Sequence, residues 1–261
     1  MGLGLRRSKR RRLGQNFLVD LGVAERIVGL LADEPARVIE IGPGRGALTE
    51  LLLERFDRVL ALELDEPLVA PLEDRFGDLG LEVIHADALA VGLDEVAGNA
   101  NGWQVASNLP YSVGTAILRR LMPRHDLFSR LVVMLQHEVA LRVVAAPGEG
   151  AHGLMALERA AWAEARLAFT VPPRAFRPAP KVMSAVIVLD LRPPTTDPST
   201  IERALALAGR ALTRPRKMLP NALGKSITAD RIEQAGLDPK ARPGELSLED
   251  WLRLSAGQPP K

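Results

Sequence analysis

The sequence predicts an α/β protein with a mostly parallel sheet and a second, small helical domain at its carboxyl end. Three observations lead to this prediction. Short runs of β-branched and apolar residues alternate with stretches whose apolar residues recur at helical spacing. Two late apolar runs are joined by a Pro-rich turn, which favours an antiparallel final strand, and the segments after residue 199 read as helices. Strands that alternate with helices form right-handed crossovers, so helices cover both faces of the parallel sheet.

Five strands are expected in the parallel part of the sheet. In chain order they cover residues 37–41, 59–62, 81–84, 103–107 and 131–135. Helices are expected between them, because Leu48, Leu51 and Leu52 have helical spacing and Pro67 suits the first turn of a helix. The carboxyl ends of parallel strands share one edge of the sheet, where ligands bind in such folds. The residues that directly follow these strand ends include Gly42, Glu63, Asp87 and Asn108.

The later part of the chain divides into a strand pair, a linker and a helical region. Residues 164–171 and 182–190 are expected to form two antiparallel strands. Residues 192–199 are expected to form a linker, because prolines and small polar residues continue neither a helix nor a strand. Ser247 stands three residues before Asp250, a capping pattern at a helix start. The expected organisation is a basic arm over residues 1–12, a domain over 13–194 and a helical domain over 197–261.

The composition excludes several classes of protein. Of the 261 residues, 47% are hydrophobic and 25% are charged, which is typical of a globular chain and not of a disordered or fibrous one. The absence of cysteine excludes disulfides and thiolate chemistry, and the four histidines lack metal-ligand spacing, so no metal site is expected. No apolar run is long enough to span a bilayer and the amino terminus lacks the apolar core of a signal peptide. We therefore expect a cytoplasmic protein with no membrane partner.

Charge is distributed unevenly along the chain. Residues 1–12 carry six basic and no acidic side chains, residues 13–104 carry six basic and eighteen acidic ones, and the remainder carries 22 basic and 14 acidic ones. This segregation indicates that the ends of the chain meet a polyanion. The alternative is that these are the solvated faces of a neutral enzyme.

A glycine-rich turn follows the first expected strand of the sheet. Its sequence, Glu-Ile-Gly-Pro-Gly-Arg-Gly-Ala at 40–47, lets a ligand approach the backbone because glycines lack Cβ atoms. The same residues satisfy the pattern of dinucleotide-binding proteins, and a tight turn without a ligand is the alternative. Glu63, 21 residues after Gly42, is placed to accept hydrogen bonds from both hydroxyls of a ribose. Asp87 can accept from an adenine amino group, and helix capping is an equally natural role for it.

The segment Ser107-Asn108-Leu109-Pro110-Tyr111 contains the only tyrosine of the chain. Its residue types suit methyl transfer to an exocyclic amino group, whose lone pair is delocalised into its ring. The Asn108 oxygen and a backbone carbonyl can accept the two N–H protons and favour a lone pair out of the ring plane. Tyr111 can stack on the base while Pro110 stiffens the loop. No strong general base is required, because the amine becomes acidic once methylated. The alternative is an Asx-type turn with a buried tyrosine.

Three segments together resemble one family, the ribosomal RNA adenine N6-dimethyltransferases of the KsgA type. They are Asn-Leu-Pro-Tyr at 108–111, Glu-Ile-Gly-Pro-Gly-Arg-Gly-Ala-Leu-Thr at 40–49 and Leu-Gly-Gln-Asn-Phe-Leu at 13–18. Later segments are also similar to that family, at 136–142, 171–182, 216–217 and 245–251. The resemblance implies a Rossmann-like class I methyltransferase sheet with a helical C-terminal domain. It also implies S-adenosyl-L-methionine as cofactor and dimethylation of two adjacent adenosines near the 3′ end of small-subunit rRNA. The expected partner is the assembling small ribosomal subunit, and we expect a monomer.

The resemblance also assigns roles to individual residues. Those that it places against the cofactor are Asn16, Leu18, Gly42, Gly44, Glu63 at the ribose, Asp87 at the adenine amino group, and Asn108. The expected catalytic residues are Asn108, Leu109, Pro110, Tyr111 and Phe176, the two aromatic rings stacking on the target adenine. The basic residues expected to bind RNA phosphates are Arg10, Arg11, Arg12, Arg174, Arg177, Lys181, Arg214, Arg216 and Lys217. Residues 147–153 and the proline at 220 depart from the family pattern.

Three alternative functions remain at this point. The related Erm group methylates an adenine of large-subunit rRNA and confers antibiotic resistance, but Gly-Pro-Gly, Asn-Leu-Pro-Tyr and the C-terminal segment favour the small-subunit enzyme. A nicotinamide dehydrogenase would need a catalytic His or a Tyr-Lys arrangement, which the sequence does not show. A non-catalytic nucleic-acid-binding protein on the same fold is disfavoured by the intact loop at 108–111.

Overall fold

The computed structural model describes residues 15–98, 100–224 and 227–256. Contacts between these residues divide the chain into two compact units. The first, here called the sheet unit, runs to Ala140 and resumes over Ala165–Arg192. The second, the helical unit, contains Leu141–Glu164 and the chain from Pro193 onward. Residues 141–164 were expected in the methyltransferase domain, and the contacts group them with the C-terminal helices.

One seven-stranded sheet, with strand order β4-β3-β2-β5-β6-β9-β7, dominates the sheet unit as described. Its strands are β2 (Arg37–Ile41), β3 (Arg58–Glu63), β4 (Leu81–His85), β5 (Trp103–Asn108), β6 (Phe128–Gln136), β7 (Ala163–Val171) and β9 (Ser184–Leu191). β2 pairs in parallel with β3 and β5, β3 with β4, and β5 with β6, whereas β6 and β9 are antiparallel. The predicted α/β fold, mostly parallel with an antiparallel strand late in the chain, is confirmed.

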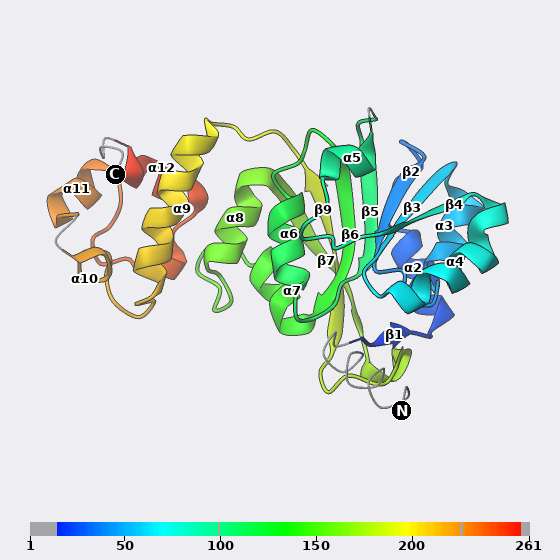
Figure 1. Ribbon diagram of the computed structural model, residues 1–261. Coiled ribbons are helices and arrows are strands. Elements are labelled where there is room, and N and C mark those ends of the chain that lie inside the picture. Colours follow the sequence, from blue (N-terminus) through cyan, green and yellow to red (C-terminus); the bar gives the residue numbers. More distant parts are fainter. Residues whose placement is uncertain (1–14, 99, 225–226, 257–261) are drawn as a thin grey trace, which may run out of the picture. The chain divides into compact units, whose positions relative to one another are not determined.

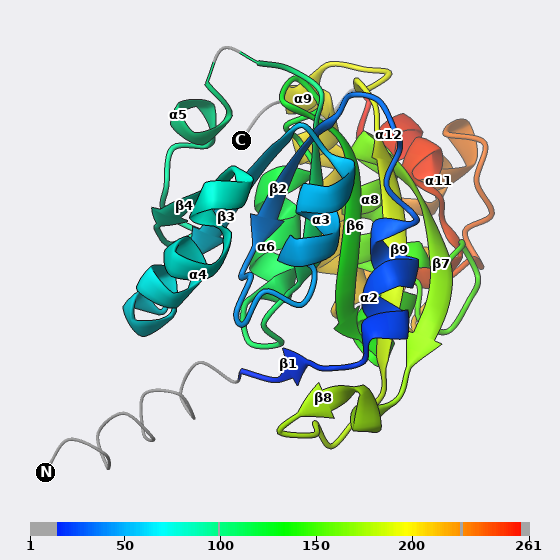
Figure 2. The same cartoon turned by 90° about the vertical axis from the view of Figure 1, so that its right-hand side faces the viewer.

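Helices cover both faces of this sheet. Figure 2 shows α2 and α3 in front of the strands and α6 behind them. The helices of this part of the chain are α2 (Leu21–Val28), α3 (Thr49–Arg55), α4 (Val69–Phe76), α5 (Leu93–Ala97) and α6 (Gly114–Leu121). The next helix, α7 (His137–Val144), begins in the sheet unit and continues into the helical unit at Leu141. Alternate residues of the strands, such as Val59 and Ala61 of β3, join Ile27 of α2 and Leu52 of α3 in one hydrophobic core. Successive side chains of a strand point to opposite faces of the sheet, so every second residue of a buried strand packs on the same face.

A second, two-stranded sheet ties the amino-terminal segment to a late loop. β1 (Phe17–Leu18) is antiparallel to β8 (Phe176–Arg177), with Phe17 opposite Arg177 and Leu18 opposite Phe176. Figure 2 shows β1 and β8 together below the main sheet, and Figure 1 shows β1 below it in the other view. The amide of Val19 extends the pairing by donating to the Ala175 carbonyl at 2.8 Å. The pairing therefore fixes residues 17–18 beside the Pro-rich turn.

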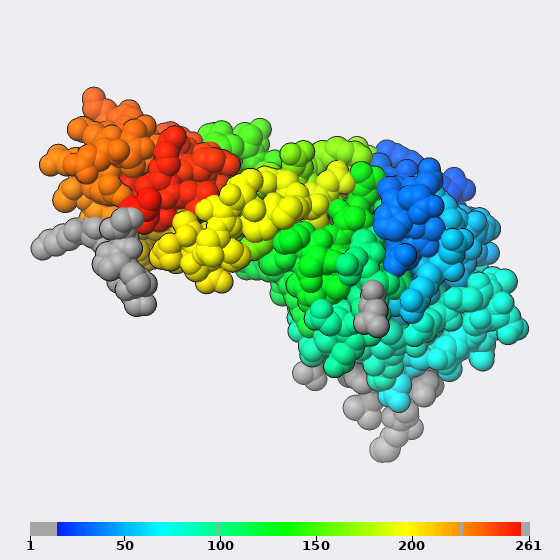
Figure 3. Space-filling model, turned by 90° about the horizontal axis from the view of Figure 1, so that it is seen from above, coloured from blue at the N-terminus to red at the C-terminus, as the bar shows by residue number. Residues whose placement is uncertain are grey.

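The helical unit contains α8 (Leu154–Trp162), α9 (Pro198–Leu212), α10 (Leu219–Leu223), α11 (Ala229–Gln234) and α12 (Leu248–Ser255). α9, in yellow, and α12, in red, lie side by side in Figure 3. Trp251 of α12 has no exposed surface in their shared core. The predicted cap is confirmed, because Ser247 Oγ accepts from the Asp250 amide and the Asp250 carboxylate accepts from the Ser247 amide. Pro220 stands in the first turn of α10, where a missing N–H is tolerated.

Within the described residues, no helix has the length and apolarity to cross a membrane.

Candidate active site

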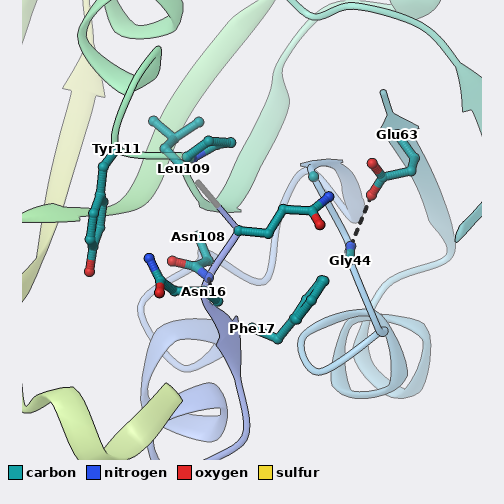
Figure 4. Close-up of a pocket in the computed structure, with 10 residues that line it drawn as sticks. Asn16, Phe17, Gly44, Glu63, Asn108, Leu109 and Tyr111 are labelled. Carbon is teal, nitrogen blue, oxygen red and sulfur yellow. Dashed lines mark hydrogen bonds between the residues drawn. The ribbon is translucent and has the colours of Figure 1, made fainter. Parts of the chain in front are cut away.

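The loops that follow β2 and β5 meet at one edge of the sheet. β2 lies between β3 and β5, and the chain leaves β2 and β5 toward helices on opposite faces, which opens a crevice between the two loops. A pocket at this point is lined by Gln15, Asn16, Phe17, Gly42, Gly44, Glu63, Asn108, Leu109, Pro110 and Tyr111. An adjoining hollow shares four of these residues and adds Leu18 and Glu40. Figure 4 shows Tyr111, Leu109 and Asn108 on one side of the pocket and Gly44 and Glu63 on the other.

The glycine loop after β2 has a backbone that only glycine adopts readily. Gly42 and Gly46 have φ of +70° and +82°, in the left-handed region. A Cβ on Gly46 would lie 2.5 Å from Cε2 of Phe76, so this glycine lets α4 pack against the loop. Among the described residues, a Cβ on Gly42 would meet no atom within 4 Å and would project from a wall of the pocket instead. Gly42 is therefore the position where backbone is open to a ligand.

Glu63 ends β3 and is almost completely buried, with 4% of its surface exposed. Its carboxylate accepts hydrogen bonds from the amides of Gly44, at 3.1 Å, and Asp65, at 2.7 Å. Burial raises the pKa of this carboxyl, and the backbone hydrogen bonds oppose that effect. Glu63 thus links the glycine loop to the next strand end while it also lines the pocket, as predicted for a ribose acceptor.

A second buried carboxyl, Glu40, lies on the preceding strand. It accepts a 2.6 Å hydrogen bond from Thr49 Oγ1, and both residues are almost fully buried. Burial raises the pKa of Glu40 to about 8, the hydrogen bond from Thr49 opposes this, and the nearby Glu63 charge adds to it. Glu40 is therefore mainly neutral at neutral pH. Sequence reasoning did not assign it a role.

Asn108 is oriented by the amino-terminal segment. Its Nδ2 donates to the backbone carbonyl of Asn16 at 3.0 Å, which brings two predicted site residues from distant parts of the sequence together. Because that carbonyl only accepts, the contact places the amide nitrogen there and leaves Oδ1 as the acceptor of the side chain. The amide of Leu109 donates to the backbone carbonyl of Met134, which fixes the loop to β6. The Pro110 carbonyl accepts from the amides of Val113 and Gly114, which fixes the loop to the start of α6.

Tyr111 is half-buried at the end of the same loop. Its hydroxyl lies 2.5 Å from Oγ of Ser184, which is the first residue of β9 and has no exposed surface. Burial raises the pKa of the Tyr111 phenol, and the hydrogen bond to Ser184 has the opposite, smaller effect. The ring lines the pocket, as predicted for a base-stacking residue.

Gln15 and Phe17 are pocket residues that sequence reasoning did not single out. Gln15 Nε2 donates to the Asp65 carboxylate at 3.0 Å, which fixes the orientation of the amide. Its Oε1 is buried and accepts no hydrogen bond from the described residues. Phe17 packs under the glycine loop, about 3.0 Å from where a Cβ of Gly44 would lie, and Arg45 stacks over its ring. Both residues belong to the segment 13–18, whose similarity to the family was the available indication.

Asp87 is not among the residues that line the pocket. The side chain is exposed and its Oδ1 accepts from the amide of Leu89 at 2.8 Å, while its carbonyl accepts from Ala90 and Val91. These contacts form a short turn, and no helix begins there, since α5 starts at Leu93. The helix-capping role that the sequence left open is therefore not what the structure shows. The predicted contact of Asp87 with the cofactor adenine stays a prediction.

Phe176 does not reach the pocket in this structure. It has no exposed surface, and it packs in the main core with Leu18 and Ala175. The expectation that its ring stacks on the target base is thus not met in this conformation. The physical reason is the pairing of β1 with β8, which sets Phe176 opposite Leu18 and turns its side chain into the core.

The basic residues predicted to bind RNA fall in three places. Arg174, Arg177 and Lys181 are exposed in the sheet unit, on the segment that connects β7 to β9. Arg214, Arg216 and Lys217 are exposed in the helical unit, between α9 and α10. Arg10, Arg11 and Arg12 lie outside the described residues.

Two observations show that the pocket fits S-adenosylmethionine. The buried Gln15 Oε1 accepts no hydrogen bond from the part of the chain that the structure describes, and the ammonium and ribose hydroxyl groups of the cofactor are donors. The face of Gly42 is open, and its backbone can be approached closely. Residues that would hold the cofactor are Gln15, Asn16, Gly42, Gly44 and Glu63.

Comparisons with known proteins agree with this geometry. A family model described as ribosomal RNA adenine dimethylase matches residues 6–257. A ribosomal RNA small subunit methyltransferase A from Magnetococcus marinus is 40% identical over 255 residues, which cover 95% of this chain and 91% of that protein. A protein of the same name from Chelativorans sp. is 38% identical over 255 residues, which cover 94% of this chain and 92% of that protein.

Solved structures share the fold over nearly the whole chain. A dimethyladenosine transferase from Plasmodium falciparum superposes with a TM-score of 0.76 at 21% identity, covering 91% of this chain and 95% of that one. The 23S rRNA methyltransferase ErmE has a TM-score of 0.73 at 25% identity, covering 92% and 98%.

The fold and the pocket define a class I methyltransferase, an enzyme that takes its methyl group from S-adenosylmethionine. Within that class, the chain belongs to the ribosomal RNA adenine dimethylase family. The family resemblance drawn from residues 13–18, 40–49 and 108–111 is therefore confirmed.

Proposed function

We propose that this enzyme transfers methyl groups from S-adenosylmethionine to N6 of two adjacent adenosines near the 3′ end of small-subunit rRNA. The relatives that are 36–40% identical over nearly the whole chain are named ribosomal RNA small subunit methyltransferase A. The observation that carries the proposal is the oriented amide of Asn108 beside the ring of Tyr111 in one pocket.

The Asn108 amide addresses the chemical difficulty of the substrate. An exocyclic adenine amine is a poor nucleophile because its lone pair is delocalised into the ring. With Nδ2 held by the Asn16 carbonyl, Oδ1 accepts one N–H of the target amine. The Pro110 carbonyl is occupied by two amides of the α6 start, so the Leu109 carbonyl is the loop acceptor for the second N–H. Two acceptors in fixed positions favour a lone pair that points out of the ring plane.

Stacking and loop rigidity hold the target base in the same place. Tyr111 presents an aromatic face to the pocket, and stacking on a flipped base contributes about 1–3 kcal/mol. When bound, S-adenosylmethionine supplies an electrophilic methyl group on its sulfonium. The N6–H proton is acidic after methylation and leaves to solvent, so no pocket residue has to act as a strong base.

Exposed cations lie on the segment of the sheet unit that pairs with the amino-terminal strand of the pocket. Arg177 lies opposite Phe17 in the β1–β8 pair, and Phe17 lines the pocket. Arg174 and Lys181 are exposed on the same segment. These side chains can neutralise phosphates of the strand that delivers the base, since RNA affinity depends largely on backbone charge. We extend the proposal to action of a cytoplasmic monomer on the assembling small ribosomal subunit.

Mapping of methyl groups on ribosomal RNA tests the proposal. Small and large subunits from cells that lack this protein are incubated with the enzyme and labelled cofactor, and digested RNA is analysed for N6,N6-dimethyladenosine. We expect dimethyladenosine at two adjacent positions in small-subunit rRNA only. Asn108→Ala serves as the inactive control and Asn101→Ala, an exposed asparagine ahead of β5, as the matched active one. Methylation of large-subunit RNA alone would favour the Erm-type alternative, to which the ErmE likeness also points.

A further inference from the structure

The ring of Tyr111 is held at both of its ends by different elements. Its Cβ end belongs to the loop after β5, where the Pro110 carbonyl accepts from the amides of Val113 and Gly114. Its hydroxyl end lies 2.5 Å from Oγ of Ser184. A ring tied at its tip cannot swing about the Cα–Cβ bond (χ1), because that motion would carry the hydroxyl away from Ser184.

The main sheet places Ser184 where it can make this contact. Asn108 of β5 is level with Met134 of β6, and Gln136, two residues further along β6, is level with Ser184 of β9. Ser184 therefore stands at the same edge of the sheet as the catalytic loop. Its side chain is fully buried, so the hydroxyl of Tyr111 meets it inside the protein and not through solvent.

We propose that Ser184 is a positioning residue for methyl transfer, which holds the Tyr111 ring at the place where the target base stacks. This inference rests on the proposed function, because the stacked base is the adenosine to be methylated. A purely structural hydrogen bond would contribute only to folding stability. A positioning contact also affects turnover, because a ring that swings about its Cα–Cβ bond holds the base less often with its amine in line with the methyl group.

The single tyrosine allows the contact to be measured directly. Phenolate absorbance of the protein reports Tyr111 alone, since the chain contains no other tyrosine. The hydrogen bond to Ser184 lowers the pKa of Tyr111, so Ser184→Ala is expected to raise it above the wild-type value. Tyr111→Phe must abolish the transition, which confirms the assignment.

Kinetics of the same variants decide whether the contact positions the ring. We expect Ser184→Ala and Tyr111→Phe each to lower kcat roughly tenfold, the size expected when one hydrogen bond is removed, with KM for the cofactor unchanged. The double variant should be no slower than the slower single one, because both changes remove the same hydrogen bond. Ser184→Thr, which keeps the hydroxyl, should recover most of the turnover. Ser129→Ala removes a half-buried serine hydroxyl near the other end of β6 and should leave turnover unchanged.

Tyr111→Phe keeps the packing at Ser184, so it supplies the test if Ser184→Ala does not fold. Wild-type kcat in Ser184→Ala and Tyr111→Phe, or additive losses in the double variant, would overturn the inference and leave the proposed function intact. A wild-type protein that methylates no small-subunit rRNA would overturn both.

Discussion

The two halves of the Asn108 amide have different tasks, and Asn108→Ala removes both. Without Oδ1 the target amine loses the acceptor that favours its reactive geometry, so we expect kcat to fall by about two to three orders of magnitude. RNA binding should persist, because stacking and phosphate contacts do not involve this side chain. Single-turnover methylation and RNA binding assays measure the two effects separately.

Asn108→Asp separates the two tasks. It keeps an acceptor but loses the N–H that donates to the Asn16 carbonyl, so its oxygens are no longer fixed. We expect it to be impaired as well, and Asn101→Ala serves as the control. Wild-type rates in Asn108→Ala would remove this residue from the catalytic role.

Glu63→Ala should weaken cofactor binding. The carboxylate is the buried acceptor expected at the ribose, and a hydrogen bond to a charged group contributes about 1.5–3 kcal/mol. Since Glu63 also holds the amides of Gly44 and Asp65, its removal should loosen the glycine loop as well. Calorimetric titration with S-adenosylmethionine measures the effect, and Glu54→Ala, an exposed glutamate on α3, is the matched control. Tight binding of NAD with none of S-adenosylmethionine would contradict the cofactor assignment.

Residue types at strand ends predicted most of the pocket, and the exceptions have physical reasons. Gly42, Glu63, Asn108 and Tyr111 line it because parallel strands end at one edge. The buried acceptor of Gln15 was not predicted, because its environment depends on Asp65, fifty positions away.

At the scale of elements, two glycines of the turn between β2 and α3 have different roles: Gly42 faces the ligand pocket, and Gly46 faces the packed helix α4. Gly42→Ala places a methyl group on the open pocket wall, so we expect loss of cofactor affinity with a stability cost of about 1 kcal/mol from the positive φ. Gly46→Ala drives a Cβ against Phe76 of α4, so we expect a larger loss of stability. Thermal unfolding without cofactor and calorimetric titration compare the two variants. A Gly42→Ala protein with wild-type affinity would contradict the placement of the ligand.

The buried carboxyl on β2 predicts a pH dependence of stability. The pKa of Glu40 is raised from 4.5 to about 8 in the folded protein, with Thr49 and Glu63 facing it. A raised pKa means that the folded state binds the proton more tightly than the unfolded state does. The contribution of this protonation to the free energy of unfolding is therefore complete below the unfolded pKa and is lost as the pH rises toward 8. We expect wild-type protein to lose stability over this range and Glu40→Gln, which carries no charge, to lose less.

Thermal unfolding of the cofactor-free proteins between about pH 5 and pH 9 measures this difference. Glu54→Gln, an exposed control, should follow the wild-type curve. Parallel curves for Glu40→Gln and the wild type would show that Glu40 is already ionised when the protein folds.

Elements with a clear sequence pattern were predicted, and those without one were not. The apolar runs of β2, β3 and β9 and the glycine turn predicted the sheet and its edge. β1 and β8 are two residues long, too short for such a run to be recognised, and their pairing joins distant segments. That pairing accompanies the burial of Phe176, so the placement of this ring could not be predicted from the sequence, and its role in stacking on the base stays a prediction. Residues 141–164 were placed by local pattern, whereas their unit is set by contacts to later helices.

At the scale of the whole molecule, charge separates the pocket from the surfaces expected to hold RNA. Residues 13–104, which supply the glycine loop and Glu63, carry eighteen acidic and six basic side chains, whereas residues 1–12 and the later chain are net basic. An acidic region disfavours phosphates near the cofactor half of the pocket. The basic residues then provide most of the affinity for a polyanion.

Reversing Arg216 and Lys217 to glutamate should weaken binding to the small subunit and flatten its salt dependence. Removing one phosphate neutralisation should reduce the slope of log affinity against log salt by roughly 0.7–0.9. Removal of residues 1–12 should have the same effect. Cofactor affinity should not change in the Arg216 and Lys217 variant, because neither residue is among the described residues that line the pocket. Lys240→Glu, an exposed cation of the helical unit outside the predicted set, is the charge control. If both variants kept the wild-type slope, these charges would be a solvated surface, and RNA recognition would rest on the segment from Arg174 to Lys181 beside the pocket.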